Sequence, residues 1–232
     1  MRPASLVLLR HGKSSANEGG RFGGWDDAHL ADSGIMQARQ AGEQLRALHL
    51  RFDLCCTSVL RRAIWTAWHC LDALDQPWIR TLPDWRLNER HYGALQGMKK
   101  ADAAAVYGAD QVRRWRRGFN ERPPPLMPGD PRDSFGAPRY AGLCRSEVPL
   151  GESLQDTQSR VLAHWRSLVL PELQRRGHNV LVVAHGNSIR ALLMVLEHIG
   201  EGDIAGVEVA NGVPIIFDCK AGADDFARRP SS

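Results

Sequence analysis

The chain has 232 residues, of which 43% are hydrophobic and 24% charged, and this composition excludes a largely disordered protein. Its formal net charge of +4 is too small to indicate a nucleic-acid partner. No apolar stretch approaches the roughly 20 residues of a membrane-spanning helix, so we expect no membrane partner. The five cysteines form an odd set without metal-like spacing, which predicts reduced, mostly buried thiols in a cytoplasmic protein.

The predicted elements alternate between strands and helices from the N-terminus onward. A short apolar strand at 6–9 leads into a polar, glycine-rich loop over 17–29 and then into a helix capped by Ser33. A strand at 52–57 precedes a helix with apolar residues at helical spacing from Leu60 to Leu74. Further along we expect a strand at 78–81, helices at 99–107, 109–118, 152–176 and 188–199, and strands at 180–184, near 207 and at 213–217.

This order of elements is typical of an α/β fold, and we expect three layers, α/β/α, around a mostly parallel sheet. The stretch 122–149 holds seven prolines and no apolar period, which predicts an extended surface loop rather than a linker between two cores. Residues 1–232 are therefore expected to form a single domain. The polar residues 220–232 are expected to be a flexible tail.

Two of the predicted strands run into the same dipeptide, His-Gly. The first reaches Arg10 and His11, and the later one reaches His185. A third strand ends at Ser58, with Arg62 one helical turn further on. Because ligands bind beyond the carboxyl ends of parallel strands, we expect two imidazoles and at least two guanidinium groups to share one crevice.

These side chains favour phosphoryl transfer over metal binding. Neutral imidazole is a competent nucleophile near pH 7, and arginines neutralise the charge on a phosphoryl group in transit. No evident carboxylate accompanies either His11 or His185 in the sequence, and nearby arginines would repel a cation. We therefore expect no metal.

Several longer motifs carry a resemblance to a known family. The block from Asn88 to Gly97 is the most specific of them. The others are Leu9-Arg10-His11-Gly12, Arg21-Phe22, Gly24-Trp25, Thr57-Ser58-Val59-Leu60 with Arg62-Ala63, Lys100, Trp115-Arg116-Arg117-Gly118-Phe119, Glu152-Ser153-Leu154 and Ala184-His185-Gly186-Asn187-Ser188. From Leu6 to Asp218 the chain resembles the histidine phosphatase superfamily and, within it, the 2,3-bisphosphoglycerate-dependent phosphoglycerate mutases, which implies a phosphoglycerate mutase-like fold.

The resemblance implies a role for each matching residue. His11 would be the nucleophile that becomes phosphohistidine, and Glu89 the general acid and base, while Arg10, Arg62 and His185 would hold the phosphoryl group. The implied substrate-binding residues are Ser14, Asn17, Gly23, Gly24, Arg90, His91, Tyr92, Lys100, Arg116, Arg117, Gly186 and Asn187. The resemblance also implies 2,3-bisphosphoglycerate as primer, small phosphorylated three-carbon acids as ligands, and no metal.

The implied reaction is the interconversion of 3-phosphoglycerate and 2-phosphoglycerate in glycolysis and gluconeogenesis. Gly23, in place of a usual hydroxyl donor, and a C-terminal end that we expect to be short keep open an alternative, a phosphohistidine-dependent phosphatase with weak mutase activity. Lys13, in place of the usual Glu, keeps open a diverged anion-binding scaffold paralogue, and Asn211 replaces a common Thr. Tryptophans expected at the surface point to a homodimer.

Overall fold

A computed structural model describes residues 4–127, 129–175, 177–219 and 225–230. Within these residues the chain forms one six-stranded sheet with the order β3-β2-β4-β1-β5-β6. The strands are β1 (Ala4–Arg10), β2 (Leu54–Thr57), β3 (Arg80–Pro83), β4 (Val180–Ala184), β5 (Pro214–Cys219) and β6 (Phe226–Arg228). The first four run parallel to one another, and β5 and β6 are each antiparallel to the preceding strand in this order. The expected mostly parallel α/β fold is confirmed.

The register between β1 and β4 brings the two His-Gly strand ends together. Arg10 pairs with Ala184 in the parallel ladder, so the next residue on each strand, His11 and His185, leaves the sheet at the same level. The neighbouring strand β2 pairs Thr57 with Val183. All three strands therefore deliver polar side chains to one edge of the sheet.

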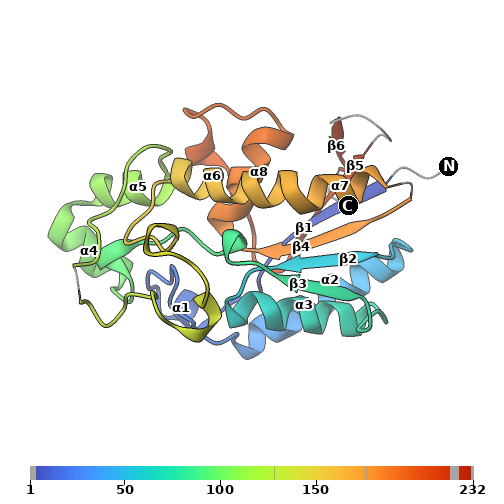
Figure 1. The fold of residues 1–232 in the computed structure, drawn as a ribbon, viewed down its shortest axis with the longest axis horizontal. Helices are drawn as coiled ribbons and strands as arrows, with labels where there is room; N and C mark the ends of the chain where they lie inside the picture. The colour runs from blue at the N-terminus through green and yellow to red at the C-terminus, as the bar shows by residue number, and fades with distance from the viewer. Residues whose placement is uncertain (1–3, 128, 176, 220–224, 231–232) are drawn as a thin grey trace.

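Helices cover both faces of this sheet, as Figure 1 shows. The helices α2 (Asp32–Ala47) and α3 (Arg61–Ala73) pack on one face, and α6 (Leu154–His164), α7 (Leu170–Gln174) and α8 (Gly186–Leu196) on the other. A π-helical stretch, Trp165–Val169, joins α6 to α7. The remaining helices, α1 (Ser15–Glu18), α4 (Lys100–Tyr107) and α5 (Ala109–Arg117), lie beyond the carboxyl ends of the parallel strands.

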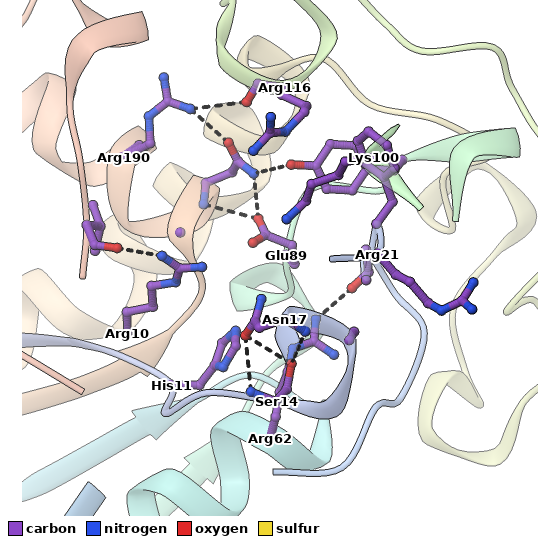
Figure 2. A pocket seen from close by; sticks show the side chains of 18 of the residues that line it. Arg10, His11, Ser14, Asn17, Arg21, Arg62, Glu89, Lys100, Arg116 and Arg190 are labelled. Carbon is purple, nitrogen blue, oxygen red and sulfur yellow. Dashed lines mark hydrogen bonds between the residues drawn. The ribbon is translucent and has the colours of Figure 1, made fainter. Parts of the chain in front are cut away.

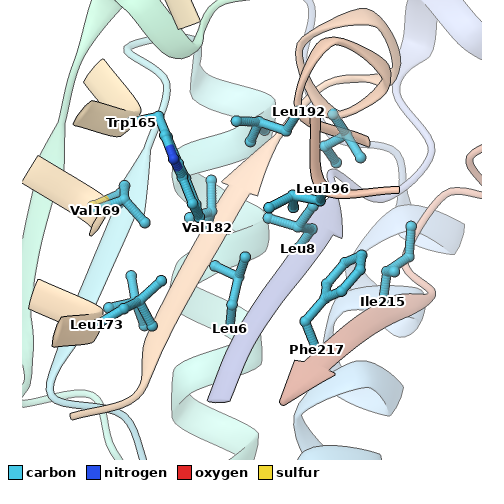
Figure 3. Close-up of a cluster of buried hydrophobic side chains, with 14 of the residues drawn as sticks. Leu6, Leu8, Trp165, Val169, Leu173, Val182, Leu192, Leu196, Ile215 and Phe217 are labelled. Carbon is cyan, nitrogen blue, oxygen red and sulfur yellow. The ribbon is translucent and has the colours of Figure 1, made fainter. Parts of the chain in front are cut away.

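Side chains of β1 alternate between two buried clusters. Leu6 and Leu8 pack with Phe217 and Trp165 on the α6–α8 side (Figure 3), whereas Leu9 joins the cluster under α2 and α3. Successive residues of a strand point to opposite faces of the sheet. The first six residues of β1 are buried and the last, Arg10, is partly buried, so both faces of this strand are covered. This double packing fixes the strand end that carries the first histidine.

Several expected element boundaries are corrected. Ser33 does not cap a helix, because α2 already begins at Asp32 after Ala31. The expected strand at 78–81 lies two residues later, and Trp78 is 74% exposed. The strand expected near 207 is absent from the described residues there, where a 3₁₀ turn, Ile204–Gly206, leads into irregular chain.

The expected flexible tail is corrected in part. Residues 226–228 form β6, which pairs with β5 and adds an edge to the sheet. Arg229 follows it and forms an ion pair with Asp218, which explains how a polar sequence can stay ordered. The other positions of that expectation, 220–224 and 231–232, lie outside the described residues.

The proline-rich stretch 122–149 contains no α-helix or strand among its described residues, only short 3₁₀ turns at Pro138–Tyr140 and Arg145–Glu147. Leu126, Tyr140 and Val148 are nevertheless buried, so the loop packs on the body of the protein. All five cysteines are free thiols, and Cys144 alone among them is exposed. None of the helices formed by the described residues has the length and apolarity needed to cross a bilayer.

Candidate active site

The rings of His11 and His185 lie against each other at the ends of β1 and β4. Their centroids are 4.9 Å apart and the planes are inclined by 58°. The Nδ1 atom of His11 lies 2.6 Å from the carbonyl oxygen of Gly12. Because a carbonyl only accepts, Nδ1 carries the proton, and the lone pair of His11 lies on Nε2. This tautomer leaves Nε2 as the nucleophilic atom.

Both histidines are held in the neutral form. Burial lowers the pKa of His11 well below its usual value, and the nearby cations Arg62 and Arg10 lower it further. Burial and the same two arginines, together with His11, lower the pKa of His185 in the same way. The Nε2 atom of His185 lies 2.7 Å from the Ser58 hydroxyl, whereas its buried Nδ1 has no partner among the described residues.

Two arginines are fixed beside these rings by backbone carbonyls. Arg62, at the start of α3, donates to the carbonyl oxygens of Asp26 and Gly24, each at 2.7 Å. Gly24 has φ of +52°, and a Cβ there would meet Gln96 Oε1 at 2.2 Å, so this position requires glycine. Arg10 donates to the carbonyl oxygen of Val209 at 2.6 Å, and its buried Nε has no partner among the described residues.

These groups border an open cavity, drawn in Figure 2. Cations dominate its wall: Arg10, Arg21, Arg62, Lys100, Arg116, Arg117 and Arg190 line it, against the carboxylates Glu89 and Glu208. Arg10 and Arg62, next to His11, are here called the inner cations. Lys100, Arg116 and Arg117, from α4 and α5, are called the outer cations. Burial and the neighbouring arginines lower the pKa of Lys100, so an anion among the outer cations would relieve their mutual repulsion.

Glu89 lies between the inner and the outer cations (Figure 2), and its charge acts on Arg10, Arg62 and Lys100 alike. Its Oε1 accepts hydrogen bonds from the backbone N–H of Arg90 at 2.9 Å and from the side chain of Asn187 at 2.9 Å. Its Oε2 has no hydrogen-bond partner among the described residues. One oxygen therefore fixes the carboxyl group, and the other is available to exchange a proton with a ligand.

Two side chains in the cavity wall, Tyr92 and Asn17, are oriented so that each can donate a hydrogen bond to a ligand. The hydroxyl oxygen of Tyr92 accepts from Asn187 Nδ2 at 3.0 Å, which leaves the phenolic hydrogen to be donated. The Oδ1 of Asn17 accepts from the Ser14 hydroxyl at 3.0 Å. The Nδ2 atom at the other end of the Asn17 amide is then available to donate to a ligand. Both groups border the cavity and can donate to an anion.

The backbone around Glu89 is held by a buried ion pair. Arg160 of α6 donates to the carbonyl oxygens of Asn88, at 2.8 Å, and of Glu89, at 2.9 Å. The guanidinium also forms a salt bridge with Glu152 at 2.7 Å, and both side chains are more than 90% buried. A third donor, Trp25 Nε1, reaches the Glu89 carbonyl oxygen at 2.7 Å. Glu89 is thus fixed through both its main chain and its side chain.

Breaking the ion pair between Arg160 and Glu152 should lower the stability of the fold strongly. We expect Arg160→Met to lower the free energy of unfolding by about 3–5 kcal/mol, because it leaves the Glu152 carboxylate buried without its charge partner. Arg122→Met, which removes an exposed pair with Asp156, should cost less than about 1 kcal/mol. Urea denaturation of both variants measures the difference. Equal losses would show that Arg160 and Glu152 contribute no more than a surface pair.

Two of the outer cations, Arg116 and Arg117, are held through their backbone carbonyls by two further arginines. Arg90 and Arg190 both donate to Asn187 Oδ1, each at 3.0 Å. Arg90 also donates to the carbonyl oxygen of Arg116, and Arg190 to that of Arg117 at 2.8 Å. The end of α5 is therefore tied to α8 through Asn187, the same side chain that holds Glu89.

The structure corrects the expectation that Arg90 and His91 bind substrate. Neither borders the cavity, and both are fully buried. The N–H of His91 donates to Glu152 at 2.7 Å, and its Nδ1 accepts from the N–H of Gly93 at 3.1 Å. These two residues support the cavity wall from behind.

The other expected site residues are brought together. Those that border the cavity are Arg10, His11, Ser14, Asn17, Gly23, Gly24, Arg62, Glu89, Tyr92, Lys100, Arg116, Arg117, Gly186 and Asn187, while His185 lies behind His11. Six further residues line the cavity without a role expected from the sequence: Ala16, Arg21, Phe22, Arg190, Glu208 and Val209. Arg21 and Phe22 were visible as a motif, but Glu208 and Val209 lay in a segment expected to be a strand.

The positions that depart from the mutase pattern have different surroundings. Lys13 is exposed and does not border the cavity, so its reversed charge faces solvent. Asn211 donates from Nδ2 to the carbonyl oxygen of His11 at 2.7 Å and thereby supports the nucleophile. At Gly23 a Cβ would lie 3.7 Å from Ala16 Cβ and 4.0 Å from Arg62 Nη2, so a methyl group would fit there in ordinary contact with both side chains.

The buried neutral histidines predict a pH dependence of stability. Burial lowers the pKa of His91 to about 3, and those of His11 and His185 are also lowered. An unfolded histidine titrates near about 6.5, so below that pH the unfolded chain binds protons that the native chain does not. Stability is therefore full above pH ~6.5 and falls below it, by up to about 1.4 kcal/mol per pH unit for each histidine.

Urea unfolding at about pH 7.5, 6.5 and 5.5 checks this slope. His91→Asn serves as the comparison, because its amide oxygen can still accept from the N–H of Gly93. Below pH ~6.5, His91→Asn should reduce the slope of the unfolding free energy against pH by the contribution of one proton, about 1.4 kcal/mol per pH unit. A slope that is flat in this range would contradict neutral burial of the three histidines.

Comparison with known proteins identifies the family. Residues 6–229 match the family described as Histidine phosphatase superfamily (branch 1). The chain belongs to this superfamily. As a member of this superfamily it is an enzyme that transfers phosphoryl groups. The expected superfamily is confirmed.

Several solved structures similar to this chain carry the name of a phosphatase or a hydrolase. A mycobacterial glucosyl-3-phosphoglycerate phosphatase with bound VO3 is 25% identical, with a TM-score of 0.73, over 97% of this chain and 96% of that chain. The protein named mycobacterial hydrolase 2 is 27% identical, with a TM-score of 0.69, over 99% and 89%. An α-ribazole phosphatase from Shigella flexneri, 22% identical over 97% and 94% with a TM-score of 0.69, shares the fold.

Proposed function

We propose that this chain is a phosphoglycerate mutase that interconverts 3-phosphoglycerate and 2-phosphoglycerate through a phosphohistidine on His11. The observation that carries the proposal is the position of Glu89 between the inner and the outer cations. A mutase must hold a second anionic group while one phosphoryl group moves. The outer cations supply that second site, which hydrolysis of a simple phosphomonoester does not require.

The residues of the chain can perform the transfer in both directions. The Nε2 lone pair of His11 attacks phosphorus while the bond from phosphorus to the ester oxygen breaks, and Glu89 gives its proton to the leaving oxygen. In the reverse step a hydroxyl oxygen of the phosphoglycerate attacks the phosphohistidine, its proton passes to Glu89, and the N–P bond breaks. Arg10 and Arg62 neutralise charge on the phosphoryl oxygens during both steps.

The cavity fits 2,3-bisphosphoglycerate as a primer. One buried polar atom at the inner cations, Arg10 Nε, has no partner among the described residues, belongs to a residue that borders the cavity and suits a phosphate. The inner cations would hold the reacting phosphate, and the outer cations the second phosphate and the carboxylate. When bound, the primer supplies the phosphoryl group that His11 takes up. The proposal includes no metal.

A phosphatase is the second candidate, and two observations favour it. Gly23 has no side chain, and a Cβ there would lie 4.0 Å from Arg62 Nη2, so its absence leaves room for water to approach a phosphohistidine. The similar solved structures include a phosphatase named for a glucosylated phosphoglycerate. In this reading water, instead of a phosphoglycerate hydroxyl, attacks the phosphohistidine, and Glu89 takes the proton of that water.

One assay on a single sample separates the two candidates. The purified protein is given 3-phosphoglycerate with and without a trace of 2,3-bisphosphoglycerate, and both 2-phosphoglycerate and released phosphate are measured. A mutase should form 2-phosphoglycerate faster than phosphate and should depend on the primer. Release of phosphate in excess of isomerisation would overturn the mutase proposal in favour of the phosphatase.

A further inference from the structure

Glu208 is a carboxylate in a wall otherwise dominated by cations. It lies in the irregular chain that follows the turn Ile204–Gly206 and borders the cavity. Its Oε1 forms a salt bridge with Arg117 Nη2 at 2.5 Å, and its side chain is 74% exposed. Unlike Glu89, whose Oε1 is held by three N–H donors, Glu208 is bound through this single cation.

The backbone that carries Glu208 connects the two groups of cations. The carbonyl oxygen of Val209 accepts from Arg10 at 2.6 Å, and that of Val207 accepts from Arg117 at 3.3 Å. The N–H of Gly212, a few residues further on, donates to the carbonyl oxygen of Arg10 at 3.0 Å. The main chain at Glu208 is therefore fixed on both sides, whereas its exposed side chain is free to turn away from Arg117.

We propose that Glu208 is a specificity-determining residue that weakens the retention of highly charged phosphoesters. The inference rests on the proposed function, because it concerns the phosphoglycerates. Without ligand, the carboxylate of Glu208 neutralises Arg117. A second anionic group that binds at the outer cations has to displace the carboxylate and remains close to its negative charge. The effect grows with the charge of the ligand at the outer cations.

Three ligands therefore respond differently to this carboxylate. Inorganic phosphate binds at the inner cations, beside His11, and does not displace Glu208. 3-Phosphoglycerate places one anionic group at the outer cations, and 2,3-bisphosphoglycerate places two there. By this mechanism the bisphosphorylated ligand is the one whose affinity Glu208 lowers most, and its release from the enzyme is made easier.

The test is calorimetric titration of these three ligands in a His11→Ala background, which binds without turnover. Adding Glu208→Gln should tighten 2,3-bisphosphoglycerate about 10-fold and 3-phosphoglycerate about 3-fold, as expected for removal of an exposed like charge. Inorganic phosphate should change least, because Glu208 acts on the inner cations only through its weaker charge interaction with Arg10. The gain should shrink as the salt concentration rises. Glu201→Gln is the matched control, since Glu201 is exposed, bonds to Asn120 and lies outside the cavity wall.

Other titration results would overturn this inference, the proposed function, or both. Equal affinities with and without the Glu208→Gln substitution overturn this inference and leave the proposed function standing. Equal tightening of all three ligands also overturns it, because it shows a general charge effect. If inorganic phosphate binds but neither phosphoglycerate does in either background, the proposed function fails and the inference with it. In an Arg117→Met background the effect of Glu208→Gln should shrink, because only the direct repulsion between the Glu208 carboxylate and the ligand then remains, and an undiminished effect would show that Glu208 does not act through Arg117.

Discussion

Replacing His11 with alanine should lower turnover by at least about 10⁴-fold, the size of effect seen when a covalent nucleophile is removed. The prediction follows from the bond between His11 Nδ1 and the Gly12 carbonyl oxygen, which leaves Nε2 as the free nucleophilic atom. His185 is the other neutral imidazole on which both inner cations act. His185 lies behind the His11 ring and does not border the cavity.

Steady-state isomerisation and phosphate release, both measured on His11→Ala, check this result. His69→Ala is the matched control, because His69 lies on α3, stacks on Trp65 and does not line the cavity. The control should keep full activity. A His11→Ala protein that retains more than about one hundredth of wild-type turnover would contradict nucleophilic catalysis by this residue.

Replacing Glu89 with glutamine should slow transfer to and from a phosphoglycerate oxygen by about 10²–10⁴-fold, as expected for loss of a general acid and base. The amide keeps an oxygen that can accept from the Arg90 N–H and from Asn187, as the carboxylate does. The geometry should therefore survive while the proton carried at Oε2 is lost. Some phosphohistidine should still form.

Rapid-quench measurement of phosphohistidine formation and decay separates the two effects in Glu89→Gln. We expect a slow but complete rise of the phosphoenzyme and a slower return of the phosphoryl group to phosphoglycerate. Glu121→Gln, at an exposed pair with Arg114, provides a carboxylate control that should behave as wild type. Transfer at the wild-type rate in Glu89→Gln would show that another group moves the proton.

The central part of the site could be predicted from sequence because local pattern and topology agree. Apolar runs that end in His-Gly identify strand ends, and parallel strands place their carboxyl ends on one edge. The pairing of Arg10 with Ala184 then brings His11 and His185 together. Arg62 follows in the same way, from its place one helical turn after a third strand.

The rest of the site depends on contacts between segments far apart in the chain. Arg90 and His91 lie in a motif of polar residues, and nothing local distinguishes Glu89, which borders the cavity, from neighbours that turn behind it to bond with Asn187 and Glu152. Glu208 was hidden for a similar reason. Its apolar neighbours suggested a strand, but the chain there is irregular and bonds through its carbonyl oxygens to arginines of the cavity.

Mapping the phosphorylated residue tests the central claim most directly. The protein is mixed with radiolabelled 2,3-bisphosphoglycerate, quenched in alkali, digested and analysed by mass spectrometry. We predict an acid-labile, alkali-stable phosphoryl group on Nε2 of His11 and none in His11→Ala. A label on His185 or on any other residue, or no label in an active preparation, would contradict the account.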